Sequence, residues 1–163
     1  MNSESNAAPT LAAIRIAAMN LLARREHSAK ELLTKLTSKF GVIDDIAEVI
    51  EKLTDDGLQS DLRFAEAFLR MRKRQGKGVV IIRAELHERG ISQQIISSVM
   101  AEEGNWDDLA LLAYHKKYGQ HSVLDMKEKS KRVRFLTYRG FSSASISYVF
   151  SMLEEGANID LDN

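Results

Sequence analysis

Apolar side chains recur along this chain at intervals of three and four residues, which places them on one face of a helix. The segments with this pattern are 11–24, 28–40, 44–56, 61–75, 79–89, 92–103, 105–118, 125–139 and 143–156. The β-branched run Val79 to Ile82 would suit a strand by itself, but Leu86 continues the helical spacing and no turn residue intervenes. The pattern therefore predicts an all-α fold.

Polar caps and glycines mark the ends of these segments. Ser28 and Glu31 form a capping box at the start of the second helix, and Asp61 and Asn105 are expected to cap the fourth and seventh helices. All nine glycines fall outside the predicted helices, and Gly156 is expected to end the ninth. This distribution supports the boundaries, because glycine inside a helix costs about 1 kcal/mol relative to alanine.

Each helix has an expected buried face. The residues expected to face inward include Leu11, Ile14, Leu32, Leu33, Leu36, Phe64, Phe68, Met71, Leu86, Met126, Val133 and Leu136. All are apolar and keep the spacing of a single helix face.

The pattern also repeats along the chain. Leu36, Leu86 and Leu136 lie fifty residues apart, and each precedes a glycine and then an isoleucine (Gly41 and Ile46, Gly90 and Ile95, Gly140 and Ile146). We expect three tandem three-helix repeats, at 11–59, 60–104 and 105–156, with disordered ends at 1–10 and 157–163. Units this small bury little core alone, so neighbouring repeats should share surfaces and form an elongated, curved array.

Composition limits the classes of protein that the chain can belong to. Its 163 residues include no cysteine, which excludes disulfides, Cys-ligated metals and thiolate nucleophiles, and which fits a reducing compartment. No apolar stretch is long enough to span a membrane, and the N-terminus has no signal-peptide pattern. We therefore expect a cytoplasmic protein.

Motifs for catalysis or cofactor binding are absent from the sequence. The lysine of Gly76-Lys77-Gly78 lies between two glycines and does not follow a phosphate-binding loop. The four histidines have no metal-ligand spacing, and we expect them on helix surfaces (His27, His87, His115 and His121). Ser142 and Ser143 suit a helix cap better than a nucleophile, and paired aspartates such as Asp107-Asp108 lie at helix ends. The sequence predicts no catalytic residue, no cofactor and no metal.

Positive charge is concentrated in two places, although the net charge of the chain is zero. The first basic patch consists of Arg70, Arg72, Lys73, Arg74, Lys77, Arg83 and Arg89. The second basic patch consists of Lys127, Lys129, Lys131, Arg132, Arg134 and Arg139. Both could be solvated helix faces. The first is denser and crosses a loop, which favours recognition of phosphates or of an acidic protein.

Four segments together resemble the bacterial RecX family. They are Leu22-Ala-Arg-Arg-Glu-His-Ser28 with Glu31-Leu32, Asp61 to Phe68 with Arg70, Gly76-Lys77-Gly78 leading to Ile82 through Ile91, and Arg134-Phe-Leu-Thr-Tyr-Arg-Gly-Phe141. They occur in the order of the family and cover roughly residues 15 to 153.

The resemblance implies a regulator of RecA, the recombinase that polymerises on single-stranded DNA. Members of the family bind the RecA filament and restrain strand exchange and its coprotease function in the SOS response. We accordingly expect a monomer that binds RecA and its DNA filament, with weak nonspecific DNA contact as a further possibility and with no membrane partner. The expected contact residues are Arg70, Arg72, Lys73, Arg74, Lys77, Arg83, Arg89, Lys129, Lys131, Arg132 and Arg134.

The alternative is a DNA-binding protein of the helix-turn-helix kind without catalytic activity, since three-helix units can resemble that motif. A recognition helix should carry Arg, Asn or Gln at base-reading positions. Only Gln93 and Gln94 form such a pair in a predicted third helix of a repeat, which disfavours base readout.

Overall fold

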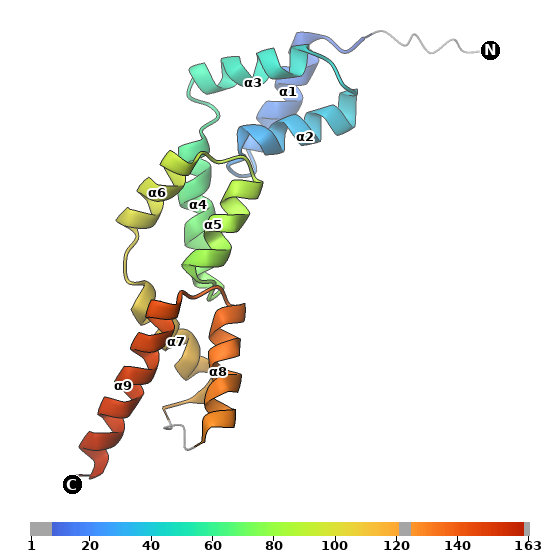
Figure 1. Cartoon of the computed structure of the whole chain (residues 1–163). Coiled ribbons are helices and arrows are strands. Elements are labelled where there is room, and N and C mark those ends of the chain that lie inside the picture. The colour runs from blue at the N-terminus through green and yellow to red at the C-terminus, as the bar shows by residue number, and fades with distance from the viewer. Residues whose placement is uncertain (1–7, 121–124, 162–163) are drawn as a thin grey trace.

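The structure, a computed structural model, describes residues 8–120 and 125–161. The described residues form nine helices and no strand, as the apolar spacing predicts (Figure 1). The helices are α1 (Leu11–Leu22), α2 (Ala29–Phe40), α3 (Asp45–Asp55), α4 (Asp61–Arg74), α5 (Val79–Glu88), α6 (Gln93–Glu102), α7 (Trp106–Tyr118), α8 (Met126–Tyr138) and α9 (Ser143–Leu161).

Each group of three consecutive helices encloses its own apolar core. We call these groups the first repeat (α1–α3), the second repeat (α4–α6) and the third repeat (α7–α9). Within each repeat the first helix packs most extensively against the third. Leu36, Leu86 and Leu136 are 1%, 0% and 0% exposed, as their matched positions predict. The matching isoleucine of the second repeat is Ile96, which is fully buried, whereas the predicted Ile95 is only partly buried.

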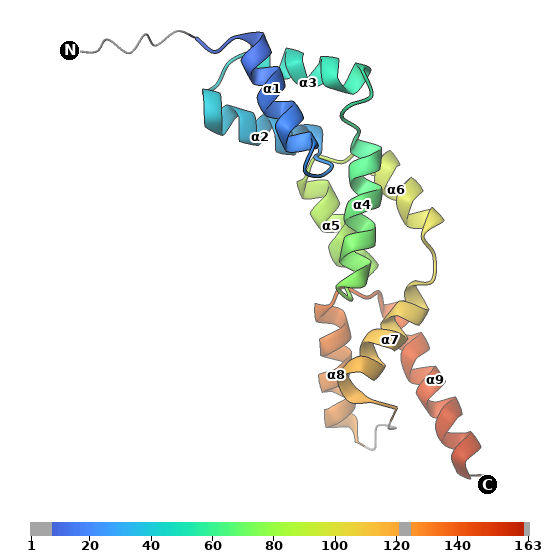
Figure 2. The same ribbon diagram turned by 180° about the vertical axis from the view of Figure 1, so that it is seen from behind.

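The repeats follow one another in an elongated, curved array whose two ends lie far apart (Figure 1). Seen from behind, α4 and α7 follow one another along the front, with α5 and α8 beside them (Figure 2). Helix α4 therefore runs along the array from the first junction to the second (Figures 1 and 2).

The two junctions bring equivalent positions of neighbouring repeats into hydrogen-bond contact. At the first, Ser28, the N-cap of α2, donates its hydroxyl to the carbonyl of Arg89 at 2.8 Å. At the second, Gly78, the N-cap of α5, donates its backbone N–H to the carbonyl of Arg139 at 2.8 Å. In both, the start of the second helix of one repeat meets the turn after the second helix of the next repeat. Equivalent residues therefore set the spacing of the array.

The second junction brings two backbones together closely. Gly140 has a φ of +90°, and a Cβ atom there would lie 2.7 Å from the Cβ of Ile81. A Cβ atom on Gly78 would clash with the backbone of Gly140 and Phe141. Glycine is thus required at both positions for the second and third repeats to approach.

Some predicted helix ends are wrong. Helix α9 continues through Gly156 to Leu161, because no proline follows and no left-handed residue stops it there. Residues 157–161, for which disorder is expected, form the last part of α9, while 1–7 and 162–163 lie outside the described residues. The cap of α4 is Ser60, whose hydroxyl accepts from the N–H of Arg63, and Asp61 is the first helical residue. Asn105 precedes α7 as expected, but its side chain makes no capping hydrogen bond.

Some residues expected to face inward are exposed. Met126 is 74% exposed, and Leu11, Leu33 and Met71 lie at the edges of their buried faces. Each stands at the margin of a helix stripe, where the three- and four-residue spacing continues but no neighbouring helix covers the side chain. The two expected core phenylalanines of α4, in contrast, are buried.

Candidate partner-binding face

Two cations of the first basic patch are joined to carboxylates of neighbouring segments. The guanidinium of Arg72 donates to both carboxylate oxygens of Glu85, with Nε at 2.6 Å from Oε2, and so connects α4 to α5. Lys73 Nζ lies 2.9 Å from Glu103 Oε2 and 5.0 Å from the centre of the Trp106 ring. These two side chains hold helices together, and their charge is already matched within the protein.

Arg89 and Arg132 also interact within the protein, with a backbone carbonyl and a tyrosine hydroxyl respectively. Arg89 Nη1 donates to the carbonyl of Glu85 at 2.9 Å, and its guanidinium lies 4.5 Å from the centre of the Phe68 ring. Arg132 Nη1 donates to the hydroxyl of the fully buried Tyr114 at 2.5 Å. Both guanidinium groups therefore pack against an aromatic side chain in the core of their own repeat.

The remaining cations of the two patches reach solvent. Arg70, Arg74, Arg83, Lys131 and Arg134 are exposed, and Lys77 is half-buried. Within the described part of the chain, no ion pair joins any of them to a carboxylate. Lys129 is intermediate, with Nζ 3.8 Å from Glu154 Oε1. Each predicted patch therefore contains both structural cations and cations free to meet a partner.

A pocket of about 420 Å³, the first pocket, lies at the junction of the first and second repeats. It is lined by Arg25, Glu26, Glu31, Phe64, Ala67, Phe68, Met71, Arg74 and Arg89. Glu31 compensates two of its cations, since its carboxylate lies 2.9 Å from Arg25 and 3.7 Å from Arg89. The charges of this pocket are therefore largely paired.

A pocket of about 380 Å³, the second pocket, lies at the junction of the second and third repeats. It is lined by Lys73, Arg74, Gln75, Gly76, Leu109, Leu112, Ala113, Lys116, Lys117, Phe135 and Arg139. Five of these are cations and none is a carboxylate. Arg74 lines both pockets, so the two hollows adjoin along one side of α4.

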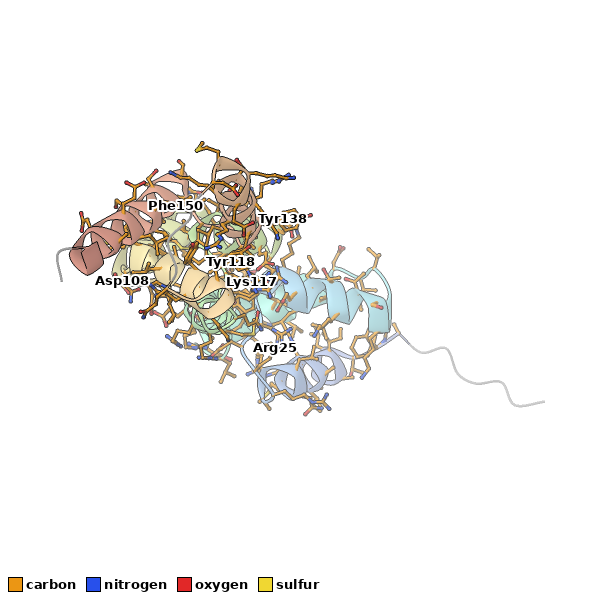
Figure 3. All side chains as sticks on the ribbon, turned by 90° about the horizontal axis from the view of Figure 1, so that it is seen from below. Arg25, Asp108, Lys117, Tyr118, Tyr138 and Phe150 are labelled. Carbon is orange, nitrogen blue, oxygen red and sulfur yellow. The ribbon has the colours of Figure 1, made fainter. Side chains whose placement is uncertain are left out.

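Lys116 and Lys117, two residues of the second pocket, were not predicted as contacts from the sequence. The signal was present, because adjacent lysines in the last turn of a helix are easily seen, but cations are common there for dipole reasons alone. Viewed along the array, Asp108 near the start of α7 lies at the left, and Lys117 near the end of α7 lies closer to the middle of the molecule (Figure 3). Only the fold shows that these lysines share a pocket with Arg74.

His27 is not on a helix surface as predicted but buried at the first junction, 2% exposed. Its Nδ1 lies 3.1 Å from the carbonyl of Arg25 and its Nε2 lies 3.1 Å from Lys35 Nζ. Because the ammonium can only donate, the partners assign the neutral ring with the proton on Nδ1. Burial lowers the pKa of His27 below its ordinary value of 6.5. The side chain belongs to the packing of the junction.

Two further findings concern the described residues. No group of three His, Asp or Glu side chains among them is placed to hold a metal ion. None of their helices is long and apolar enough to cross a membrane.

The fold and the charged face define a helical-repeat protein of three tandem three-helix units. Family models match each unit: the first three-helix domain of RecX at residues 15–53, the second at 60–100 and the third at 106–150. The chain belongs to the RecX family of regulatory proteins.

Similar proteins agree with this assignment. The chain is 40% identical over 143 residues to "Regulatory protein RecX" of Pseudomonas tolaasii, which covers 87% of this chain and 92% of the relative. It is 42% identical over 134 residues to the protein of that name from Legionella pneumophila (strain Corby), covering 82% and 89%. The crystal structure of RecX from Lactobacillus salivarius superposes with a TM-score of 0.73 at 26% identity, covering 88% of this chain and 96% of that one.

Proposed function

We propose that this protein binds RecA and its filament on single-stranded DNA, inhibits recombinase and coprotease activity, and so modulates recombinational DNA repair and the SOS response. The observation that carries the proposal is the match of all three repeats to RecX domains, in order, between residues 15 and 150. The elongated array supports it, because stacked repeats present long surfaces suited to extended partners.

The free cations are the proposed contacts with the filament. Arg70, Arg74, Lys77, Arg83, Lys131 and Arg134 project without a carboxylate partner among the described residues. Arg72, Lys73, Arg89, Lys129 and Arg132 act mainly by holding the helices that present them. Binding through such a surface needs no catalytic group, so the proposed inhibition is stoichiometric and involves no turnover.

The test is a titration of the purified protein into the DNA-dependent ATPase assay of RecA, with a parallel titration onto single-stranded DNA alone. We expect ATP hydrolysis to fall in proportion to the protein added, and the protein alone to hydrolyse no ATP and cleave no DNA. Inhibition that appears only where the protein coats all free DNA would favour competition for DNA and would contradict direct binding to RecA.

A further inference from the structure

The second pocket holds an apolar side chain that the fold does not cover. Leu112 is 64% exposed although it lies in the lining of a pocket. Around it stand the exposed cations Arg74, Lys116 and Lys117, none of them in an ion pair with a carboxylate of the described residues. Leu112 is not buried in a hydrophobic core, and the three cations are in no ion pair of the described residues. The stability of the fold therefore does not explain why these side chains lie together. An apolar centre with a charged rim is typical of a surface that a partner covers.

We infer that the second pocket binds an acidic segment of a partner protein, which inserts a leucine or phenylalanine side chain against Leu112 and pairs its carboxylates with the surrounding cations. Charge complementarity determines the sign of the partner, because the lining contains four cations that are in no ion pair of the described residues, and no carboxylate. The inference rests on the proposed function, since the partner is the protein that this chain regulates.

The size and lining of the pocket suit an apolar anchor. Its volume of about 380 Å³ is within the range of sites that enclose small ligands. Leu109, Leu112 and Ala113 form an aliphatic wall on α7. Burial of one large apolar side chain against such a wall favours binding, because it removes apolar surface from water.

The aromatic ring in the pocket argues against a nucleic acid. Bases bind single-strand-binding proteins by stacking on open aromatic rings. Phe135 is approached by Lys117 Nζ at 5.6 Å and by the Arg139 guanidinium at 5.4 Å from its ring centre. Two cations therefore already lie over this ring, whereas the aliphatic wall on α7 is the open apolar contact surface.

The junction holds the pocket in shape. Arg139 Nη1 donates to the carbonyl of Gln75 at 3.2 Å, and its own carbonyl accepts from Gly78. These bonds join the end of α4 to the end of α8 across the two repeats. A preformed pocket binds an extended segment without first ordering itself.

The experiment measures binding of the full-length protein to a short fluorescein-labelled peptide in which glutamate alternates with leucine, by fluorescence anisotropy. The test variants are Leu112→Glu and the pair Lys116→Gln with Lys117→Gln. The matched control, Lys39→Gln with Lys127→Gln, removes the same charge from exposed positions on α2 and α8 outside the pocket. All four lysines and Leu112 are exposed, so circular dichroism should show unchanged folding.

Both test variants should bind the peptide about tenfold more weakly than the parent, and the control within about twofold. A peptide with serine in place of leucine should bind the parent about tenfold more weakly. Equal binding of the two peptides, or an equal loss in the control, would overturn the inference. So would an oligothymidine that binds more tightly through Lys116 and Lys117, or a dimer that Leu112→Glu dissociates in sedimentation.

The RecA assay separates this inference from the proposed function. If the parent inhibits RecA but does not bind the acidic peptide, the pocket inference alone is wrong. If the parent binds the peptide through the pocket but has no effect on RecA, the proposed function is wrong and the pocket has another acidic partner.

Discussion

Each repeat has one leucine at an equivalent buried position in its core. Leu36, Leu86 and Leu136 occupy equivalent places in three separate cores and are almost completely inaccessible. Replacing any one by alanine should lower the free energy of unfolding by about 2 to 5 kcal/mol, from lost burial and the cavity left behind. Urea denaturation of the three variants tests this, with Leu33→Ala on the exposed edge of α2 as a control expected to change little. A loss at Leu86 no larger than in the control would show that the repeats are not equivalent.

The buried imidazole of His27 should make stability depend on pH. Because burial lowers its pKa in the folded state, the unfolded chain binds the proton more readily, and protonation favours unfolding. The free energy of unfolding should therefore lose a contribution as the pH falls below the ordinary pKa of 6.5.

Chemical denaturation of the parent and of His27→Gln, between about pH 7 and about pH 5, measures that contribution as a difference of slopes. The parent should lose more stability than the variant on acidification, and NMR titration should place the pKa of His27 below 6.5. Parallel slopes for the two proteins, or a pKa at or above the ordinary value, would contradict the neutral buried ring.

At the scale of elements, helix ends fix the geometry of the array. Gly57 and Gly140 both have positive φ, at +73° and +90°, so alanine at either position introduces strain of about 1 to 2 kcal/mol. At Gly57 a Cβ atom meets nothing within 4 Å, whereas at Gly140 it meets Ile81. Gly140→Ala should therefore cost more than Gly57→Ala and should also change the angle between the second and third repeats. Thermal unfolding and small-angle scattering measure the two effects, and equal behaviour of the variants would exclude a role of Gly140 in the junction.

At the scale of the whole molecule, the exposed cations that are in no ion pair should contribute strongly to inhibition of RecA. The pair Arg70→Glu with Arg83→Glu reverses two exposed charges that have no described carboxylate partner, so stability should be unchanged. Inhibition of RecA ATPase should weaken about tenfold at moderate salt, where long-range attraction is already screened. Reversal of Arg72 or Lys73 would be uninformative, because it would break an ion pair within the protein.

The matched control for this pair is Arg24→Glu with Lys39→Glu, which makes the same change of charge at exposed positions in the first repeat. It should retain inhibition within about twofold of the parent. If both pairs lose inhibition equally, general electrostatic attraction explains the effect. If neither does, the contact surface lies outside the first basic patch.

The helices, the period of fifty residues and the buried leucines can all be predicted from the sequence. These are local properties, since the spacing of apolar residues decides which face of a helix is buried wherever that helix lies. Similarly, Ser28 caps α2 through a hydrogen bond to a residue three positions away. The resemblance to RecX also rested on short segments that can be read in order along the chain.

Which cations are in no ion pair, and where these cations lie close together, depends on the three-dimensional fold. Lys73 is paired with Glu103, thirty residues away, whereas the adjacent Arg74 is exposed in both pockets. Lys116 joins Arg74 in one pocket across more than forty positions of sequence. Likewise His27, polar and in a loop, is buried at the first junction, where Gln59, 32 positions away, donates to its carbonyl. Ion pairs, pockets and junctions depend on distances between residues far apart in the chain, and a linear pattern of residue types does not contain those distances.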